Sequence, residues 1–142
     1  MHNHIKLPMA VLTIGLLTAC VGCSTDQLVW GQEGAAVRSV SNEFVEDMRT
    51  TGDSAQLCTG SNADLGDPAD WAGLAAGEPE EYDGGSWEEY ADLSPSWLIN
   101  LSAAEVSGEA SQREVPAFLF FRGSGEDLCV VDIAWGERFT TP

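Results

Sequence analysis

Basic residues are scarce in this chain of 142 residues. Six lysine and arginine residues stand against 23 aspartate and glutamate residues, which gives a net charge of −17 at pH 7. Nucleic-acid phosphates and anionic lipid headgroups repel a chain this acidic, so we expect no nucleic-acid partner. The acidity indicates either a cationic partner or an acidic bias set by habitat or genome composition, and we favour the bias.

Histidine is nearly absent as well. The two histidines are His2 and His4, and the rest of the chain carries no imidazole. This absence excludes Ser-His-Asp and Cys-His catalytic sites and histidine-ligated metals beyond residue 4. Paired carboxylates and oxygen-ligated metals remain possible in principle. No spacing in the sequence indicates either, so we predict no catalytic residue, no metal and no cofactor.

A long apolar run is also missing. The apolar segment at residues 9–17 is shorter than the roughly 20 residues needed to span a bilayer. It follows Lys6 and leads into small residues, which is the pattern of a secretory signal peptide. A buried helix is the alternative, but such a helix would not normally lead into a polar, glycine-containing stretch. We therefore predict a signal peptide over residues 1–19.

The four residues Leu17-Thr18-Ala19-Cys20 closely resemble the lipobox of bacterial lipoproteins, which has an aliphatic residue, two small residues and a cysteine. The resemblance implies that Cys20 receives a diacylglyceryl group and becomes the first residue of the mature chain. Each buried methylene contributes about 0.8 kcal/mol, and two acyl chains anchor stably where one does not. Cys23 is a rival acceptor, but it would place Cys20 at the aliphatic position.

This interpretation places the protein on the extracytoplasmic face of the cell membrane, anchored by its lipid. Loss of the leader removes both histidines and the single lysine, so five arginines remain and the net charge becomes −18. We predict a lipidated cysteine and flexible tether at residues 20–34 and a single domain at 35–142. Within the tether, Trp30 either docks onto the domain or rests at the membrane interface, and we favour docking.

The domain is predicted to be helical first and then stranded. Apolar residues at steps of three and four form one stripe on a helix over residues 35–50, namely Val37, Val40, Phe44 and Met48. Glycine, proline and capping residues indicate shorter helices, and apolar alternation indicates strands. These helices are predicted at 54–58, 67–77 and 86–93, and the strands at 96–106, 114–122 and 128–135.

Turn-forming joints between the strands predict an antiparallel meander with 114–122 in the middle. Alternation predicts one face made of the following residues: Trp97, Ile99, Leu101, Val115, Ala117, Leu119, Phe121, Cys129, Val131, Ile133 and Trp135. Phe118, Phe120 and Val130 point to the other face. Because two exposed phenylalanines would form a sizeable apolar patch, we expect the C-terminal tail, a loop, a second subunit or a ligand to cover them.

Cys58 and Cys129 remain in the domain once Cys20 is lipidated. The extracytoplasmic compartment is oxidising, so we predict a disulfide between them. It would close a loop of about 70 residues and stabilise the fold by about 4 kcal/mol. It would also place the sheet face that carries Cys129 against the helices.

Helices first, an antiparallel sheet last and a cysteine on each part resemble the cystatin-like, nuclear-transport-factor-like α+β roll of many small bacterial lipoproteins. The likeness rests on the helix at 35–50, the segment 52–58 and the segment 127–131. It implies N-terminal helices packed on a C-terminal antiparallel sheet of three or more strands. That family includes enzymes, ligand binders and interaction modules, so the fold alone does not select a function.

Aromatic residues are the leading candidates for a pocket or an interface. Trp97, Phe118, Phe120 and Trp135 could bind a small apolar ligand, a protein or a second copy of the chain through the sheet face. Trp71, Trp87 and Tyr90 could likewise line an apolar pocket. In a small domain such aromatic residues are more often the core itself. Three polar residues in the predicted strands either project into such a pocket or face solvent: Asn100, Glu105 and Asp132.

Acidic residues gather at 78–92, and the turn Asp83-Gly84-Gly85 could offer oxygen ligands to calcium. The spacing does not match an EF-hand loop, so we favour a solvated loop and helix caps. The acids at 64, 67 and 70 are likewise explained by helix capping.

Together these features favour a lipid-anchored, non-enzymatic extracytoplasmic module that binds a protein or a small apolar ligand. One alternative is a pocket enzyme that uses a carboxylate such as Glu105 or Asp132 as acid or base. The other is a structural spacer in an envelope assembly. A carboxylate deep in an apolar cleft would favour the enzyme, whereas burial of Phe118 and Phe120 within the monomer would remove the predicted interface.

Overall fold

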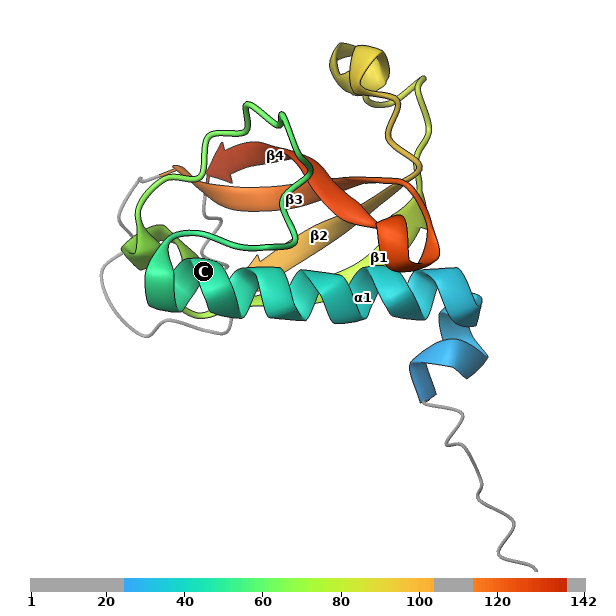
Figure 1. The fold of residues 1–142 in the computed structure, drawn as a ribbon, viewed down its shortest axis with the longest axis horizontal. Helices are drawn as coiled ribbons and strands as arrows, with labels where there is room; N and C mark the ends of the chain where they lie inside the picture. The colour runs from blue at the N-terminus through green and yellow to red at the C-terminus, as the bar shows by residue number, and fades with distance from the viewer. Residues whose placement is uncertain (1–24, 104–113, 138–142) are drawn as a thin grey trace, which may run out of the picture.

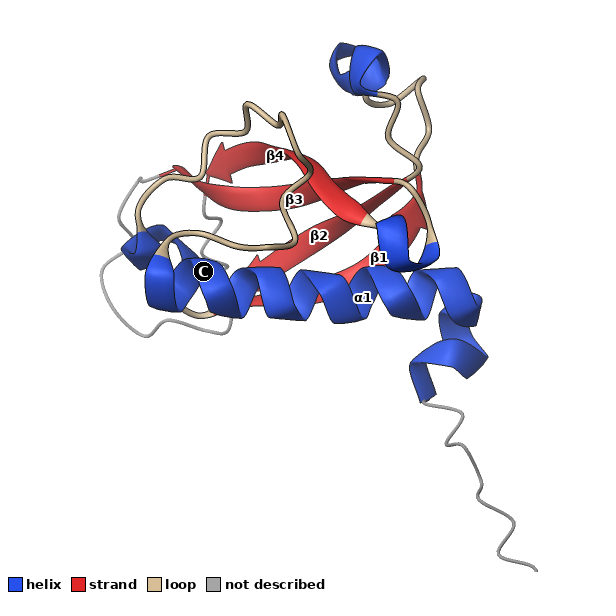
Figure 2. Cartoon of the chain, viewed as in Figure 1, coloured by secondary structure: helices blue, strands red, loops and turns tan. Residues whose placement is uncertain are grey.

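A single long helix crosses one face of a four-stranded antiparallel sheet in the computed structural model, which describes residues 25–103 and 114–137 (Figures 1 and 2). The helix is α1 (Thr25–Thr51), and the strands are β1 (Leu74–Glu81), β2 (Trp97–Ala103), β3 (Glu114–Arg122) and β4 (Cys129–Glu137). Three short 3-10 turns are η1 (Pro68–Trp71), η2 (Glu88–Leu93) and η3 (Gly125–Asp127). The strands lie in chain order, so the predicted α+β meander is confirmed with a fourth strand added. The predicted signal peptide, Cys20, Cys23 and Glu105 lie outside the described residues.

The predicted apolar stripe packs α1 against the sheet. Val37, Phe44 and Met48 are fully buried, and the ring of Phe44 meets that of Trp71 edge-on with centres 5.4 Å apart. Ser41 is buried on the same side, where its hydroxyl donates to the carbonyl of Val37 at 2.7 Å. This contact satisfies the one hydroxyl that the stripe buries.

The helix α1 begins ten residues before the predicted helix. Residues 25–34, predicted as a flexible tether, are helical apart from a break at Gly31, whose φ of 73° and ψ of −179° are not helical. Glycine adopts a positive φ without the clash that a side chain would bring. The ring of Trp30 lies under the guanidinium of Arg38, which is 4.7 Å from the ring centre. The predicted docking of Trp30 onto the domain is therefore confirmed.

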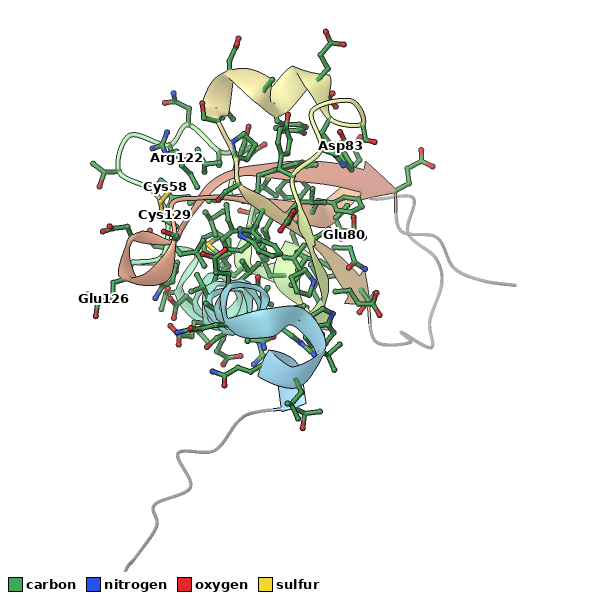
Figure 3. The ribbon with its side chains drawn as sticks, turned by 90° about the vertical axis from the view of Figure 1, so that its right-hand side faces the viewer. Cys58, Glu80, Asp83, Arg122, Glu126 and Cys129 are labelled. Carbon is green, nitrogen blue, oxygen red and sulfur yellow. A yellow bond between two sulfur atoms is a disulfide. The ribbon has the colours of Figure 1, made fainter. Side chains whose placement is uncertain are left out.

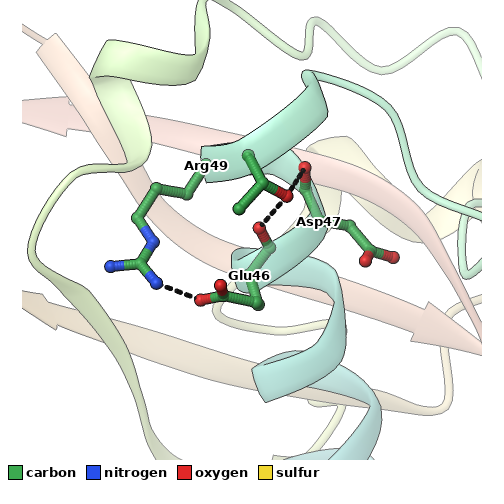
Figure 4. A network of polar contacts seen from close by, with 4 residues as sticks. Glu46, Asp47 and Arg49 are labelled. Atoms are coloured by element: carbon green, nitrogen blue, oxygen red, sulfur yellow. Dashed lines mark hydrogen bonds and ion pairs between the residues drawn. The ribbon is translucent and has the colours of Figure 1, made fainter.

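The last turn of α1 carries polar contacts on its solvent side (Figure 4). Arg49 forms an ion pair with Glu46, and the hydroxyl of Thr50 donates to the carbonyls of Glu46 at 2.8 Å and Asp47 at 3.2 Å. The cation suits the negative end of the helix, although an ion pair this exposed contributes little to stability.

The segment after α1 corrects two predicted helices. η1 begins as predicted, because the backbone N–H of Asp67 donates to Oδ2 of Asp70 at 2.8 Å and Pro68 follows the cap. Its predicted continuation to residue 77 is wrong, since Gly73 turns the chain with a φ of 72° and β1 begins at Leu74. The turn before Leu93 is helical as predicted, in 3-10 form.

The predicted helix at 54–58 is also wrong. The chain turns after Asp53 and then runs alongside the outer edge of β4. The N–H of Cys58 donates to the carbonyl of Val130 at 2.8 Å, and the N–H of Val130 donates to the carbonyl of Gln56 at 2.8 Å. This short parallel pairing covers part of the exposed edge of β4.

The predicted disulfide joins Cys58 to Cys129 and closes a separation of 71 residues (Figure 3). Cys58 reaches it from the covering segment beside β4. The prediction that Cys129 lies on the face covered by helices is wrong, because Cys129 and Cys58 belong to the cluster on the opposite face.

A β-bulge explains the error. Phe121 pairs with Val130 whereas Phe120 pairs with Asp132, so Val131 is an extra residue in β4. The alternation of side chains therefore shifts within the strand. Val131 lies with Cys129 opposite the helix, while Val130 lies on the helix side, contrary to the sequence-based alternation.

The sheet face opposite α1 has its own apolar cluster. Phe120 is fully buried, with its ring stacked on that of Tyr90 at 4.0 Å between centres. Trp87 and Tyr82 meet it edge-on at 5.4 and 6.4 Å. These rings come from the connection between β1 and β2, which stands above the sheet in Figure 3. The predicted cover is therefore a loop of the same chain.

Candidate functional site

The strands separate into two pairs at one end of the sheet. Among the described residues, β2 pairs with β3 over Trp97–Asn100 and Phe118–Phe121. Beyond Asn100, β2 continues to pair with β1, and the start of β3 pairs with β4. Figure 2 shows β2 and β3 diverging toward the left of the view. We call the opening between the two strand pairs the fork.

Two features of β3 lie where the fork opens. Pro116 has no amide hydrogen, so it cannot donate a hydrogen bond to β2. Ala117 is an extra residue in β3, because Pro116 pairs with Trp135 and Phe118 pairs with the adjacent Ala134. The proline and the bulge together disfavour continued pairing between β2 and β3.

A cavity of about 510 Å³ occupies the fork. Its described walls come from the starts of β1 and β3, from the ends of β2 and β4 and from the connection before η2. The largest side chains in these walls are Leu74, Trp87, Leu101, Pro116, Phe118 and Trp135. The volume and the largely apolar lining are typical of small-molecule sites. We call this space the fork cavity.

Trp135 forms a fixed part of the wall. Its indole N–H donates to the carbonyl of Asp64 at 3.1 Å. A Cβ at Gly66 would lie 2.3 Å from the ring, so the ring packs directly on the backbone there. Gly66 also has a φ of 59°, which glycine adopts readily. The loop at residues 64–66 therefore holds the ring in one orientation.

Trp87 and Phe118 form another part of the wall. Their ring centres are 4.8 Å apart with the planes tilted. The backbone carbonyl of Trp87 accepts a hydrogen bond from the hydroxyl of Tyr82 at 2.6 Å, which ties the connection to the end of β1. Both rings are half-buried, so each presents apolar surface to the cavity.

Two polar side chains lie among the described lining residues. Asn100 uses its Oδ1 to accept the N–H of Glu78 at 2.9 Å, and it lies against Gly77, where a Cβ would be 2.4 Å from that oxygen. Glu137 is exposed at the end of β4. As far as the described residues go, the fork cavity therefore has mainly apolar walls that include Asn100, with one carboxylate, Glu137, at its exposed rim.

The predicted pocket residues divide into two groups. Phe118 and Trp135 line the fork cavity. Phe120 is fully buried beneath Tyr82, Trp87 and Tyr90, which we call the loop cluster. Trp97 packs on the helix-side core. Trp87, predicted both in a short helical turn and among the aromatic residues that could line a pocket, also lines the cavity. Pro116 lines it as well and was not predicted. A proline inside a central strand was the available signal, because proline is confined there to edges and bulges.

Of the predicted polar candidates, Asn100 lines the fork cavity and Asp132 does not. Asp132 borders a separate pocket of about 120 Å³ with Arg122 and Asn62, and its Oδ1 accepts the N–H of Ile133 at 2.8 Å. Figure 3 shows Arg122 near the disulfide. Asp132 is half-buried in polar surroundings, so it does not lie in the apolar cleft that an acid or base would need.

The acidic turn is organised by its own backbone. Oδ1 of Asp83 accepts the N–H of Gly85 at 3.0 Å, and Oδ2 accepts the hydroxyl of Ser86 at 3.2 Å. Glu80 and Asp83, labelled in Figure 3, are both exposed. Within residues 25–103 and 114–137, no group of three or more histidine, cysteine, aspartate or glutamate side chains is placed to hold a metal ion.

The two tyrosines of the loop cluster have altered acidity. Burial raises the pKa of Tyr90, and the negative charges of Asp132 and Glu89 raise it further. Partial burial also raises the pKa of Tyr82, with a smaller contribution from nearby acids. Both phenols are therefore held in their neutral form beside the sheet.

Within the described part of the chain, no helix combines the length and apolar character that crossing a bilayer requires. Comparison of the chain with models of known protein families, with curated proteins and with solved structures finds no match. The fork cavity is therefore the feature from which function can be argued.

Proposed function

We propose that the protein is a lipid-anchored extracytoplasmic module that binds a small apolar ligand in the fork cavity. The observation that carries the proposal is the cavity itself, about 510 Å³ with mainly apolar walls at a break in the sheet. A compound that fills such a space gains free energy from each apolar surface it removes from water.

The walls are suited to binding without rearrangement. Trp135 is held by Asp64 and Gly66, and Trp87 is held through its packing on Phe118. Large aromatic rings with few rotatable bonds lose little entropy on binding. The cavity therefore favours a ligand of defined shape over a loosely held detergent.

The charge of the rim narrows the ligand class. Glu137 lies at the rim, and the whole chain carries a net charge of −17. Both features repel an anion. The proposed ligand is therefore an uncharged or cationic apolar molecule rather than a fatty carboxylate. Glu137 is the one carboxylate among the described lining residues and stands in water, which favours binding over catalysis.

A blocking substitution tests the cavity. Ala103→Trp places a large ring at the exposed end of β2, where residue 103 lines the cavity. Ala75→Trp is the matched control, because Ala75 is an exposed alanine on the neighbouring strand outside the lining. Titration of residues 20–142 carrying Cys20→Ser with the uncharged dye Nile red should show saturable fluorescence. Ala103→Trp should weaken binding at least tenfold, or about 1.4 kcal/mol, while Ala75→Trp leaves it unchanged.

Two results would contradict binding at the fork. One is the absence of saturable binding by the parent chain. The other is equal weakening by both tryptophan substitutions, which would indicate a surface effect.

The anchor is tested separately by Cys20→Ala in the full-length chain. The lipobox resemblance predicts that the parent chain fractionates with membranes and that Cys20→Ala releases it. Cys23→Ala is the control and should stay bound. Undiminished membrane retention of Cys20→Ala would defeat the lipoprotein proposal.

A further inference from the structure

Large apolar side chains are exposed at one place in the described part of the chain. Leu28 is 78% exposed and Val29 is 63% exposed, and they are the large hydrophobic residues left open there. They are adjacent and lie in the first turns of α1, before the break at Gly31. We call residues 25–30 the proximal turn.

The orientation of the proximal turn is set by specific contacts. The backbone of Gly31 bends the chain with a φ of 73°. The guanidinium of Arg38 then reaches back across the bend, donating to Oδ1 of Asp26 at 3.1 Å and covering the ring of Trp30. Because Gly34 has no side chain, Trp30 can pack against its backbone. These contacts, which we call the clamp, hold the proximal turn against the rest of α1. Trp30 faces the helix, and Leu28 and Val29, the apolar pair, face away from it.

The clamp also lowers the local charge. Asp26 is paired with Arg38, so the carboxylate nearest in sequence to Leu28 and Val29 is partly neutralised. The long-range field of the acidic domain still disfavours an anionic surface. A surface that accepts Leu28 and Val29 should therefore be apolar and carry no net negative charge.

The predicted lipid anchor at Cys20 would bring such a surface, the bilayer, close to Leu28 and Val29. Cys20 precedes Leu28 by eight residues, which span at most about 28 Å even when fully extended. With the anchor in the bilayer, the apolar pair stays close to the headgroup layer. We propose that Leu28 and Val29 insert into the interface of a bilayer with neutral headgroups and so fix the orientation of the domain on the membrane. This inference rests on the proposed lipidation of Cys20.

A depth-dependent quenching experiment tests the insertion. The lipidated chain with Cys23→Ser is reconstituted in phosphatidylcholine vesicles, and a single NBD label is placed through Val29→Cys. Nitroxide-bearing lipids quench NBD on contact. Ala55→Cys is the matched control, since Ala55 is an exposed residue beyond the other end of α1. Quenching at 29 should exceed quenching at 55 about threefold or more, because only the proximal turn enters the lipid.

A substitution at Arg38 tests the clamp separately. Arg38→Gln removes both the contact with Asp26 and the cover over Trp30. It should reduce the excess quenching at 29 by about half or more while thermal unfolding of the core changes little, because Arg38 is not a core residue. Unchanged quenching would overturn the role of Arg38.

The outcomes separate the two proposals. Equal quenching at 29 and 55, with membrane retention still dependent on Cys20, would overturn insertion and leave the anchor intact. Retention that does not depend on Cys20 would overturn the anchor. A label at 29 that is shielded from water but not quenched would show that a second copy of the chain covers it and would overturn the lipid assignment.

Discussion

Phe120 links the sheet to the connection that covers it. It is fully buried and stacks on Tyr90, while Trp87 and Tyr82 contact its edges. Phe118 lies on the same face but is half-buried and borders the fork cavity. Two neighbouring phenylalanines therefore have different roles, one in the fold and one in the proposed site.

This difference predicts unequal effects of truncation. Phe120→Ala should lower the free energy of unfolding by about 3–5 kcal/mol, because it leaves a cavity beneath three rings. Phe118→Ala should cost about 1–2 kcal/mol and should weaken Nile red binding, because its ring is partly exposed in the cavity wall. Urea unfolding with a shared slope measures both losses. Equal losses would contradict the assignment of Phe120 to the core and Phe118 to the site.

Tyr90 predicts how stability depends on high pH. Burial raises its pKa above the ordinary value of about 10, and the charges of Asp132 and Glu89 add to the shift. Above pH about 10 the unfolded chain loses the phenolic proton while the folded chain keeps it. The contribution of Tyr90 to the free energy of unfolding is therefore fully present below pH about 10 and is lost as the pH rises toward the raised pKa of the folded state.

Tyr90→Phe removes this titration. Its unfolding free energy should fall less steeply above pH about 10 than that of the parent, whereas the two profiles should run parallel at lower pH. Urea unfolding across this range, with tyrosinate absorbance followed in the folded state, provides the measurement. Identical slopes above pH about 10 would contradict a raised pKa at Tyr90.

At the scale of elements, α1 and the three later strands could be predicted because their apolar residues repeat with clear periods. β1 could not, since its sequence Leu-Ala-Ala-Gly-Glu-Pro-Glu-Glu contains residues that are depleted in strands. It is a strand because β2 pairs with it and α1 packs on it. Tertiary contacts override local preference at such a segment.

The candidate site was less predictable than the fold. Phe118 and Trp135 were identified as aromatic residues, but the fork depends on Ala117, an ordinary alanine that becomes a bulge only through its pairing. Because of the bulge at Val131, Cys129 and Val130 likewise lie on the faces opposite to those that simple alternation predicted. Bulges arise from the register between two strands, which one strand's sequence does not reveal.

The disulfide fixes the segment that covers the edge of β4. Cys58 makes one of the two backbone contacts with Val130, Gln56 makes the other, and the bridge from Cys58 closes a separation of 71 residues. Replacing both Cys58 and Cys129 with alanine should lower the unfolding free energy by about 4 kcal/mol through the gain in entropy of the unfolded chain. Amide hydrogen exchange at Val130 should accelerate more than exchange in β2, because the edge contact loosens first.

Cys23→Ala serves as the control and should leave stability and exchange unchanged. Intact mass after alkylation of the unreduced protein should show no modification at Cys58 or Cys129. Ready alkylation of both, or a stability loss confined to the control, would contradict the structural role of the bridge.

At the scale of the whole molecule, electrostatic repulsion acts throughout the fold. The chain carries 23 acidic residues against six basic ones, and the described residues contain two ion pairs, Arg38–Asp26 and Arg49–Glu46, both partly exposed. Exposed ion pairs contribute at most about 1 kcal/mol each, so screening them with salt destabilises the fold only slightly. The same salt also screens the repulsion among the many carboxylates, and we expect this relief to stabilise the fold by more than the screened ion pairs destabilise it.

Stability should therefore rise with ionic strength. The melting temperature should increase by a few degrees between about 10 mM and 150 mM NaCl, where the Debye length falls from about 30 Å to 8 Å, and then level off. Sucrose at matched osmolality is the control and should not show this plateau. Glu81→Gln, which removes an exposed charge from β1, should raise the melting temperature at low salt and reduce the salt response. A melting temperature that falls as salt is added would show that the two ion pairs outweigh the repulsion, contrary to the charge count.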